Sequence, residues 1–305
     1  WYKISYQQSL EYCQMPFKYI LLALSVVAIW GINFVVIQVA LKEIPPLMLT
    51  FLRFFFAAFP AVFFLKRPQN TSWKMLFYYS LTMFVLDFSL LFSGMNVGVS
   101  SGIASLSLQT QVFFTAILAV IFLKEKMSLP KIVGATVAFS GIVFVGFHTG
   151  GDVNLLGLVL VEGAAFSWAM GNLFSKQIGK VDMISLVVWG SLLSLPFLLG
   201  LSFVLEVDYW KVETFRHLSW LSIGSIAYLV YPVTLFGFAI WSFLLSRYPA
   251  TTVAPFTLLV PVFGFSSSAL LVGEALPSWK LIAAFLIVSG LIINLYGERF
   301  FKKEK

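Results

Sequence analysis

The chain has 305 residues and a net charge of +7, yet only 11% of its residues are charged and 60% are hydrophobic. Soluble domains carry about 25% charged residues, so this composition excludes a water-soluble protein and predicts an all-α membrane protein with several spans. The positive charge is no sign of nucleic-acid binding, because basic residues in such a protein first report its orientation in the membrane.

The first 16 residues, WYKISYQQSLEYCQMP, precede the first apolar run and contain no signal-peptide core. We interpret residues 1–16 as an N-terminal extension, either a short addition or cloning remnant or a cytosolic tail. Cys13 is the only cysteine, which excludes an intrachain disulfide. The two histidines, His148 and His217, lie near predicted span ends, so the sequence predicts no metal site and no cofactor.

Charge clusters and Gly/Pro breaks divide the rest of the chain into ten apolar runs, each close to the 20 or so residues that cross a bilayer. They lie near 18–41, 45–65, 73–95, 101–123, 130–148, 155–178, 184–205, 219–245, 251–272 and 277–297. The connections between them leave no room for a soluble domain. The longest, at 206–217, is polar and aromatic and is expected at the membrane interface.

The basic residues predict which side of the membrane each end of the chain occupies. Of the 20 Lys and Arg residues, fifteen are counted on the side of the N-terminus, Arg53 is counted within a span, and four are counted in connections on the opposite side, namely Lys42, Lys211, Arg216 and Lys280. Because cytoplasmic segments carry the excess of basic residues, both termini are predicted to be cytoplasmic. Residues 299–305 then form a basic cytoplasmic tail.

The two halves of the chain resemble one another. The run ASLSLQTQVFF at 104–114 aligns with APFTLLVPVFG at 254–264, and Glu125 then aligns with Glu274 after a slip of one residue. We infer two five-helix repeats, residues 17–150 and 151–298. Since five is odd, the second repeat must enter the membrane in the opposite orientation. Inverted repeats of this kind are typical of secondary transporters, whose substrate site lies near the midplane between the repeats.

Polar and aromatic residues occur together near the start of each repeat. Trp30 and Asn33 lie in the first span, and Trp168 and Asn172 lie in the sixth. An offset of 139 aligns the asparagines and misaligns the tryptophans by one residue, so the equivalence is approximate. We predict that all four contact the substrate, although an aromatic residue in a membrane helix also commonly serves packing alone.

The fourth span carries polar side chains on two faces. Ser105 and Gln109 share one face, while Ser107 and Gln111 share another, about 160° away. We expect one face to line a cavity and the other to bond to neighbouring helices, and we favour Gln109 for the cavity. In the eighth span, Tyr228 and Tyr231 are further candidates for the cavity wall.

Three charged residues stand out because they lie deep within predicted spans, where charge is costly and often functional. Arg53, Asp87 and Glu162 fall at similar depth, roughly 10–12 Å below the outer boundary. We predict that at least two of them pair or line one cavity. Asp87 is the candidate proton carrier and also a candidate substrate-binding residue. The alternative for each is a structural ion pair or a side chain that reaches outward to water.

Four segments resemble EamA-type members of the drug/metabolite transporter superfamily. They are WGINFVVIQ at 30–38, PPLMLTFLRFFFAAFPAVFF at 45–64, FSWAMGNLFSKQI at 166–178 and RYPATTVAPFTLLVPVFG at 247–264. The resemblance extends from about residue 17 to 298. It implies ten helices in two inverted repeats around a central cavity, and export of small metabolites, often amino acids, with cysteine and O-acetylserine as the expected cargo.

The resulting hypothesis is a secondary active transporter that exports such metabolites across the bacterial inner membrane by alternating access. The sequence predicts no enzyme, because no catalytic nucleophile, metal cluster or P-loop is evident. Expected partners are membrane lipid and a small-molecule substrate, without nucleic acid, for a monomer or homodimer. The alternatives are an exporter of amphipathic drugs or other metabolites, or a non-carrier such as a channel or scramblase.

Overall fold

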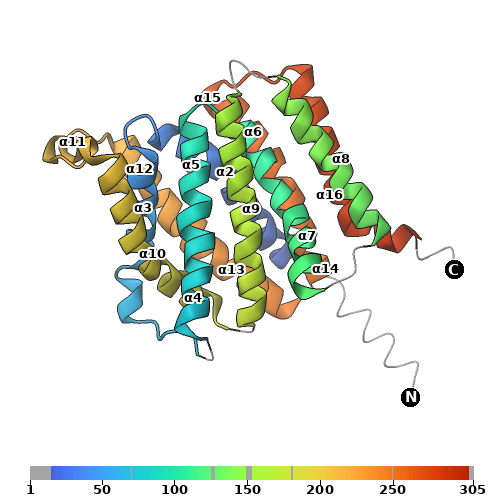
Figure 1. Cartoon of the computed structure of the whole chain (residues 1–305), viewed down its shortest axis with the longest axis horizontal. Helices are drawn as coiled ribbons and strands as arrows, with labels where there is room; N and C mark the ends of the chain where they lie inside the picture. The colour runs from blue at the N-terminus through green and yellow to red at the C-terminus, as the bar shows by residue number, and fades with distance from the viewer. Residues whose placement is uncertain are drawn as a thin grey trace.

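A computed structural model describes residues 15–69, 71–124, 128–148, 153–179, 181–248 and 250–301. Within these residues, ten helices are long and apolar enough to cross a membrane, and they pack as one bundle (Figure 1). The predicted all-α fold with ten spans is therefore confirmed, with ends within a few residues of the predicted ones. Residues 1–14 of the predicted extension, Glu125 of the predicted repeat and residues 302–305 of the predicted tail lie outside the described residues.

Each span is one helix or a run of consecutive helical segments. In chain order the spans are α2 (Phe17–Ala40); α3 (Pro46–Ala58) with η1 (Ala61–Phe63); α4 (Trp73–Ser80), η2 (Leu81–Leu86) and α5 (Asp87–Asn96); α6 (Ser101–Ser107), η3 (Leu108–Thr110) and α7 (Gln111–Leu123); α8 (Leu129–Gly146); α9 (Leu155–Ile178); α10 (Met183–Leu205); α12 (Trp220–Tyr228), η5 (Leu229–Phe236) and α13 (Gly237–Arg247); η6 (Ala254–Leu259) with α15 (Val260–Val272); and α16 (Ser278–Phe301). The connections contain η4 (Val207–Tyr209), α11 (Val212–Arg216) and α14 (Ala250–Val253).

Irregular helical turns recur in corresponding spans of the two halves. The third span of each half contains a wide π-helical segment, η2 in one and η5 in the other. The fourth span of each half contains a tight 3-10 segment, η3 in one and η6 in the other. Lys124 and Gly273, which are 149 residues apart, both end a helix in the left-handed conformation, with φ of 55° and 70°. This recurrence is what an internal duplication predicts.

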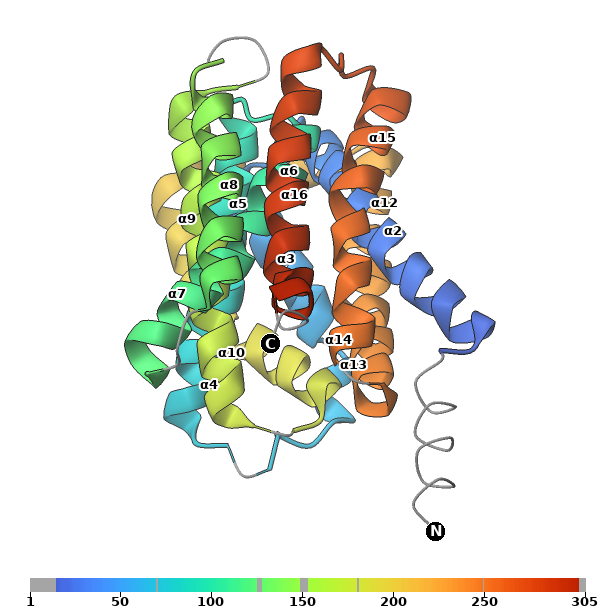
Figure 2. The ribbon, with the colours of Figure 1, turned by 90° about the vertical axis from the view of Figure 1, so that its right-hand side faces the viewer.

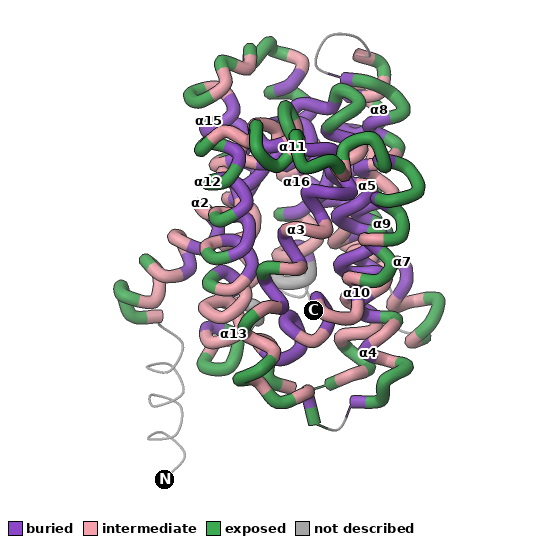
Figure 3. Tube along the Cα trace, turned by 90° about the vertical axis from the view of Figure 1, so that its left-hand side faces the viewer, coloured by how far each residue is buried: buried purple, intermediate pink, exposed green. Residues whose placement is uncertain are grey.

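The packing between the halves shows the same correspondence. α2 packs against α15, and its counterpart α9 packs against α7; α5 packs against α9, and its counterpart α13 packs against α2. α3 pairs with α10, and α8 pairs with α16 along the side of the bundle (Figure 2). Buried residues lie where helices face one another, and exposed residues lie on outward faces and loops (Figure 3). The core is therefore shared by both halves.

At the end of the bundle that is predicted to face outside, carboxylates of one half cap helices of the other. Glu206, which follows α10, accepts hydrogen bonds from the backbone N–H groups of Leu47 and Met48 at 2.9 and 2.8 Å. These are orphan donors in the first turn of α3, where negative charge is also favourable. A side chain of the second half thus accepts hydrogen bonds from the free N–H groups at the start of a helix of the first half.

Two further carboxylates do the same at this end. Glu43 accepts hydrogen bonds from the Ser219 backbone at 2.9 Å and the Ser222 hydroxyl at 2.7 Å, at the start of α12. These bonds, that of Ser222 foremost, hold the pKa of Glu43 below its ordinary value. Glu274 accepts from the backbone N–H of Gly102 at 3.1 Å, in α6. Carboxylates therefore join the two halves at this end of the bundle.

Glycines allow α8 and α16 to approach until their backbones touch. A Cβ atom added at Gly290 would lie 2.5 Å from the carbonyl oxygen of Gly134 and 2.8 Å from Ala138. Backbone atoms cannot rotate away, so Gly290→Ala must push the two helices apart. Overpacking of this kind costs about 1–3 kcal/mol, and we expect the detergent-purified variant to melt several degrees below the wild-type protein.

Gly200 in α10 offers a matched control, because a Cβ atom there meets nothing within 4 Å. Alanine has the higher helix propensity, so Gly200→Ala is expected to leave the melting temperature unchanged or to raise it. Equal melting temperatures for the two alanine variants would contradict the close backbone contact between α8 and α16.

Candidate functional site

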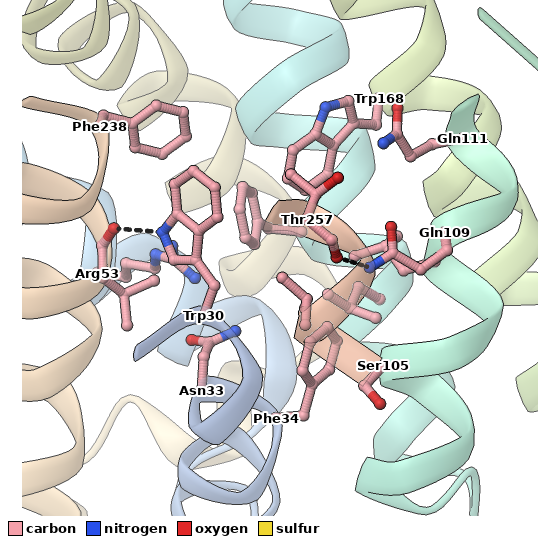
Figure 4. Close-up of a pocket in the computed structure, with 15 residues that line it drawn as sticks. Trp30, Asn33, Phe34, Arg53, Ser105, Gln109, Gln111, Trp168, Phe238 and Thr257 are labelled. Atoms are coloured by element: carbon pink, nitrogen blue, oxygen red, sulfur yellow. Dashed lines mark hydrogen bonds between the residues drawn. The ribbon is translucent and has the colours of Figure 1, made fainter. Parts of the chain in front are cut away.

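A small internal cavity lies between the two halves, and seven of the ten spans contribute to its wall (Figure 4). Its volume is about 100 Å³. The lining residues are Trp30, Asn33 and Phe34 of α2, Arg53 of α3, Phe88 and Leu91 of α5, Ser105, Leu108, Gln109 and Gln111 of the fourth span, Trp168 of α9, Val233 and Phe238 of the eighth span, and Thr257 and Val260 of the ninth. A single water molecule needs about 10–15 Å³, so the cavity has room for a small polar ligand.

The two tryptophans of the repeats reach the cavity from opposite halves (Figure 4). The indole Nε1 of Trp30 donates a hydrogen bond to the carbonyl oxygen of Val233 at 3.2 Å. Its ring lies against Phe238, at 5.8 Å between centroids, and Trp241, at 5.2 Å. The Val233 carbonyl is available because it lies in η5, where the wide turn interrupts regular helical bonding. The ring is therefore held in one orientation at the cavity wall.

Of the eight residues predicted to bind substrate, four line this cavity: Trp30, Asn33, Gln109 and Trp168. The other four lie elsewhere. Asn172 donates hydrogen bonds to the side chains of Gln111 and Thr115 at 3.1 and 3.2 Å, so its amide joins α9 to α7. The approximate alignment of the two asparagines is thus matched by different environments, since Asn33 faces the cavity and Asn172 faces a neighbouring helix.

The two tyrosines of the eighth span, Tyr228 and Tyr231, lie in different environments, and neither lines the cavity. The Tyr228 hydroxyl donates a hydrogen bond to the carbonyl oxygen of Ile29 at 3.1 Å. Tyr231 is 55% exposed and lies in an apolar groove beside Leu52 and Phe56, on the other side of α3 from the cavity. Residues three apart share a face in a regular α-helix, but the π-helical turn between Leu229 and Phe236 contains more residues per turn and moves Tyr231 off that face.

The expectation that only one face of the fourth span reaches the cavity is wrong, because both Gln109 and Gln111 line it. The 3-10 turn at Leu108–Thr110 has 3.0 residues per turn in place of 3.6. Residues two apart are then separated by about 120° instead of about 160°. Gln109 Nε2 donates to the Thr257 carbonyl at 3.4 Å, which joins the fourth span to the ninth across the cavity.

Two of the three charged residues predicted deep within spans, Arg53 and Asp87, interact electrostatically. Arg53 is 1% exposed, and its Nε donates a hydrogen bond to the hydroxyl of Thr234 at 3.1 Å. Asp87 is 0% exposed, lies near enough to interact electrostatically with Arg53, and does not line the cavity. Neither carboxylate oxygen of Asp87 has a hydrogen-bond partner among the described residues. The two charges therefore interact electrostatically without a hydrogen bond between them among the described residues.

Glu162 lies apart from this pair. Its Oε2 accepts a hydrogen bond from the Thr110 hydroxyl at 2.8 Å, while its Oε1 is buried without a described partner. The contact joins α9 to the 3-10 turn of the fourth span. Glu162 does not line the cavity. It lies between α9 and the fourth span, where it bonds to Thr110.

Several cavity residues were missed by sequence reasoning. Thr257 carries a detectable signal, because it is the only hydroxyl residue in APFTLLVPVFG and lies 150 residues after Ser107. Phe34, Phe88 and Phe238 carry none, since 33 phenylalanines are spread through the chain. Apolar lining residues are distinguished from lipid-facing ones only by the packing of several spans.

Comparison with known proteins identifies relatives along nearly the whole chain. The model of the EamA-like transporter family matches residues 17–147 and 155–296. A protein of Escherichia coli named "Probable amino-acid metabolite efflux pump" is 40% identical over 291 residues, which cover 93% of this chain and 97% of that protein. A Salmonella typhimurium protein of the same name is 41% identical over 285 residues, which cover 91% and 95%.

More distant similarity extends to other bacteria and to a solved structure. The Bacillus subtilis "Uncharacterized transporter YoaV" is 28% identical over 289 residues, which cover 92% of this chain and 97% of that protein. A solved structure described as "Crystal structure of protein" superposes with a TM-score of 0.63 at 16% identity and covers 93% of this chain and 98% of that one. This last similarity concerns the fold alone.

Proposed function

The chain belongs to the EamA-like transporter family, and from that premise we propose that it is a secondary active transporter that exports small amino-acid metabolites across the bacterial inner membrane. Cysteine and O-acetylserine are the proposed cargo. The residues that line the cavity come from one chain, so a monomer, or each copy in a homodimer, is proposed as a full transport unit.

The observation that carries this proposal is the cavity between the halves. It combines apolar walls with a few polar groups, from Asn33, Arg53, Gln109 and Gln111, that can orient a small polar molecule. Pockets for drug-sized ligands measure about 300–1,000 Å³, whereas this cavity measures about 100 Å³. Size and polarity therefore favour an amino acid over an amphipathic drug.

The direction of transport follows from the relatives. Two proteins at 40% and 41% identity carry names that describe efflux of amino-acid metabolites. The preference for cysteine and O-acetylserine within that class rests on the resemblance of the sequence segments described above. Both termini are proposed to be cytoplasmic, on the distribution of basic residues.

Alternating access is proposed from the arrangement of the halves. Contacts that recur when the halves are exchanged support a two-fold relation, and an odd number of spans per half then requires opposite orientations. The wide turns at Leu81–Leu86 and Leu229–Phe236 interrupt regular bonding next to the cavity, and such interruptions are places where a helix can bend. Movement of one half against the other would expose the cavity to each side in turn.

Counterflow in sealed proteoliposomes tests the function. Vesicles are preloaded with single unlabelled amino acids and receive labelled O-acetylserine or cysteine outside. We expect saturable accumulation that a few amino acids support and others do not. Trp168→Ala removes an aromatic side chain that lines the cavity. The KM for the labelled substrate should then rise about tenfold or more, because burial of a large aromatic side chain stabilises a bound state by a few kcal/mol.

Trp220→Ala is the matched control, since Trp220 is 86% exposed at the start of α12 and far from the cavity lining. Its kinetics should equal those of the wild-type protein. No accumulation with any amino acid, in vesicles shown to be sealed, would reject the proposed cargo and would favour other metabolites, hydrophobic drugs or a non-carrier role.

A further inference from the structure

The side chain of Arg53 presents an unusual combination of burial and incomplete bonding. It is among the largest fully buried side chains of the described residues, and it lines the cavity. Its Nε is satisfied by Thr234, but its Nη1 is buried without a hydrogen-bond partner among the described residues. An unpaired buried cation is costly, so a partner for this group is expected at some stage of the transport cycle.

The protein holds the guanidinium in a fixed orientation without bonding this donor among the described residues. The Cζ atom lies 4.2 Å from the ring centroid of Phe88 and 5.5 Å from that of Phe54. Thr234 fixes the inner edge of the guanidinium plane through Nε. Two aromatic rings and one hydroxyl therefore position a planar donor whose remaining edge suits a carboxylate.

Asp87 does not fill this place. Both of its oxygens are buried and without partners, although its charge interacts with that of Arg53. It balances part of the positive charge at a distance and leaves the hydrogen-bonding position empty. A second carboxylate brought by a ligand can therefore bind Arg53 without displacing an existing ion pair.

A complementary acceptor lies in the same cavity. Asn33 is buried, lines the cavity, and its Oδ1 has no partner among the described residues. An ammonium group is a strong hydrogen-bond donor, and this oxygen can accept a hydrogen bond from it. Two residues of the cavity wall thus carry one unbonded cationic donor and one unbonded neutral acceptor among the described residues, a pattern that matches the two ends of a zwitterion.

We propose that Arg53 binds the carboxylate of the transported molecule through Nη1, and that the cavity therefore selects small carboxylates, zwitterionic amino acids above all, against amides, amines and neutral compounds. This inference rests on the proposed function, because it names the group that the transporter recognises. It assigns Arg53 a direct contact with substrate in place of a purely structural ion pair.

The test compares two competitors that differ only at the carboxylate. Counterflow of labelled L-cysteine is inhibited by unlabelled L-cysteine or by L-cysteinamide. For the wild-type protein, half-inhibition should need about 100-fold more of the amide, because the amide leaves a buried charge unpaired. In Arg53→Gln this ratio should fall close to one, and in Arg53→Lys it should remain above that of Arg53→Gln.

The ratio separates recognition from folding, since a misfolded fraction lowers transport without changing relative competition. Arg216→Gln, the same change at an exposed position in α11, should keep the wild-type ratio. A wild-type ratio near one, or an unchanged ratio in Arg53→Gln, would overturn the proposal. If Arg53→Gln cannot be purified, the wild-type and Arg53→Lys ratios decide in the same way.

A second experiment distinguishes failure of the proposed function from failure of the proposed carboxylate site. If the wild-type protein carries no amino acid, thermal unfolding of the detergent-purified protein is measured with propionate and with propionamide. Stabilisation by propionate alone, lost in Arg53→Gln, would support the carboxylate site although the cargo is another molecule. Equal effects of the two compounds would overturn it.

Discussion

Replacing Lys280 with methionine is expected to lower the free energy of unfolding by about 3–5 kcal/mol, because it leaves a buried carboxylate without its counter-charge. Lys280 lies in the first turn of α16 and is 0% exposed, and its partner Glu274 is 4% exposed. The Nζ atom donates hydrogen bonds to Glu274 Oε1 at 2.7 Å and to the Ala275 carbonyl at 2.9 Å. Methionine keeps most of the volume and removes the charge.

The loss of stability in Lys280→Met is expected to be large because Glu274 bonds to three helices. Besides Lys280, it accepts hydrogen bonds from the Ser100 hydroxyl at 2.6 Å, from the Gly102 backbone at 3.1 Å and from the Ser268 hydroxyl. It therefore joins the start of α6, the end of α15 and the start of α16. Loss of its charge balance affects both halves at the predicted outer end.

Thermal or denaturant unfolding in detergent checks the prediction. Lys211→Met is the matched control, because Lys211 forms an exposed pair with Asp208 at 3.5 Å, with exposed fractions of 60% and 86%. Exposed pairs contribute about 0–1 kcal/mol, so this variant should unfold like the wild-type protein. The double variant Glu274→Gln with Lys280→Met should recover part of the stability. Equal unfolding of the Lys280 and Lys211 variants would contradict the buried pair.

The second large effect is expected for Asp87→Asn, which should reduce net export driven by a proton gradient about tenfold or more while counterflow continues. Asp87 is wholly buried, has no hydrogen-bond partner among the described residues and lies beside Arg53. A carboxylate in this place can take up and release a proton as its surroundings change during transport. Asparagine keeps the shape and cannot carry a proton.

Two assays on the same vesicles separate these functions, namely efflux driven by an imposed pH gradient and counterflow without a gradient. Asp208→Asn is the control, because Asp208 is exposed in the connection after α10. It should alter neither rate. If Asp87→Asn retains proton-driven efflux, Asp87 does not couple transport to protons. If the variant loses both activities, Asp87 has a structural role instead.

The spans could be predicted from sequence because the bilayer imposes a length and a composition that hydropathy alone reveals. Residue contacts could not be predicted in the same way. Lys280 illustrates the difference. Charge counting assigns it to an outer connection, whereas the structure places it in the first turn of α16 and buries it against Glu274. Glu274 is only six residues away, but it also bonds to Ser100 and Gly102 of a distant span, and the local sequence does not carry that information.

The candidate site shows the same limit. Trp30, Asn33, Gln109 and Trp168 reach the cavity as predicted from their polarity or from the repeat. Tyr231 does not, and Gln111 reaches the cavity unexpectedly. Both differences lie at or next to an irregular turn, where a periodicity of 3.6 residues no longer describes which side chains share a face.

The wide turns at Leu81–Leu86 and Leu229–Phe236 also bear on which insertions and deletions the chain can tolerate. Each turn accommodates about one residue more than an α-helix would, and one residue corresponds to about 100° of rotation. A deletion within either segment could restore a regular helix of unchanged hydropathy. It would also turn Asp87 or Thr234 away from Arg53 relative to the rest of its span. A homologue that is shorter by one residue here would still insert into the membrane as ten spans, but we expect it to carry a different cargo.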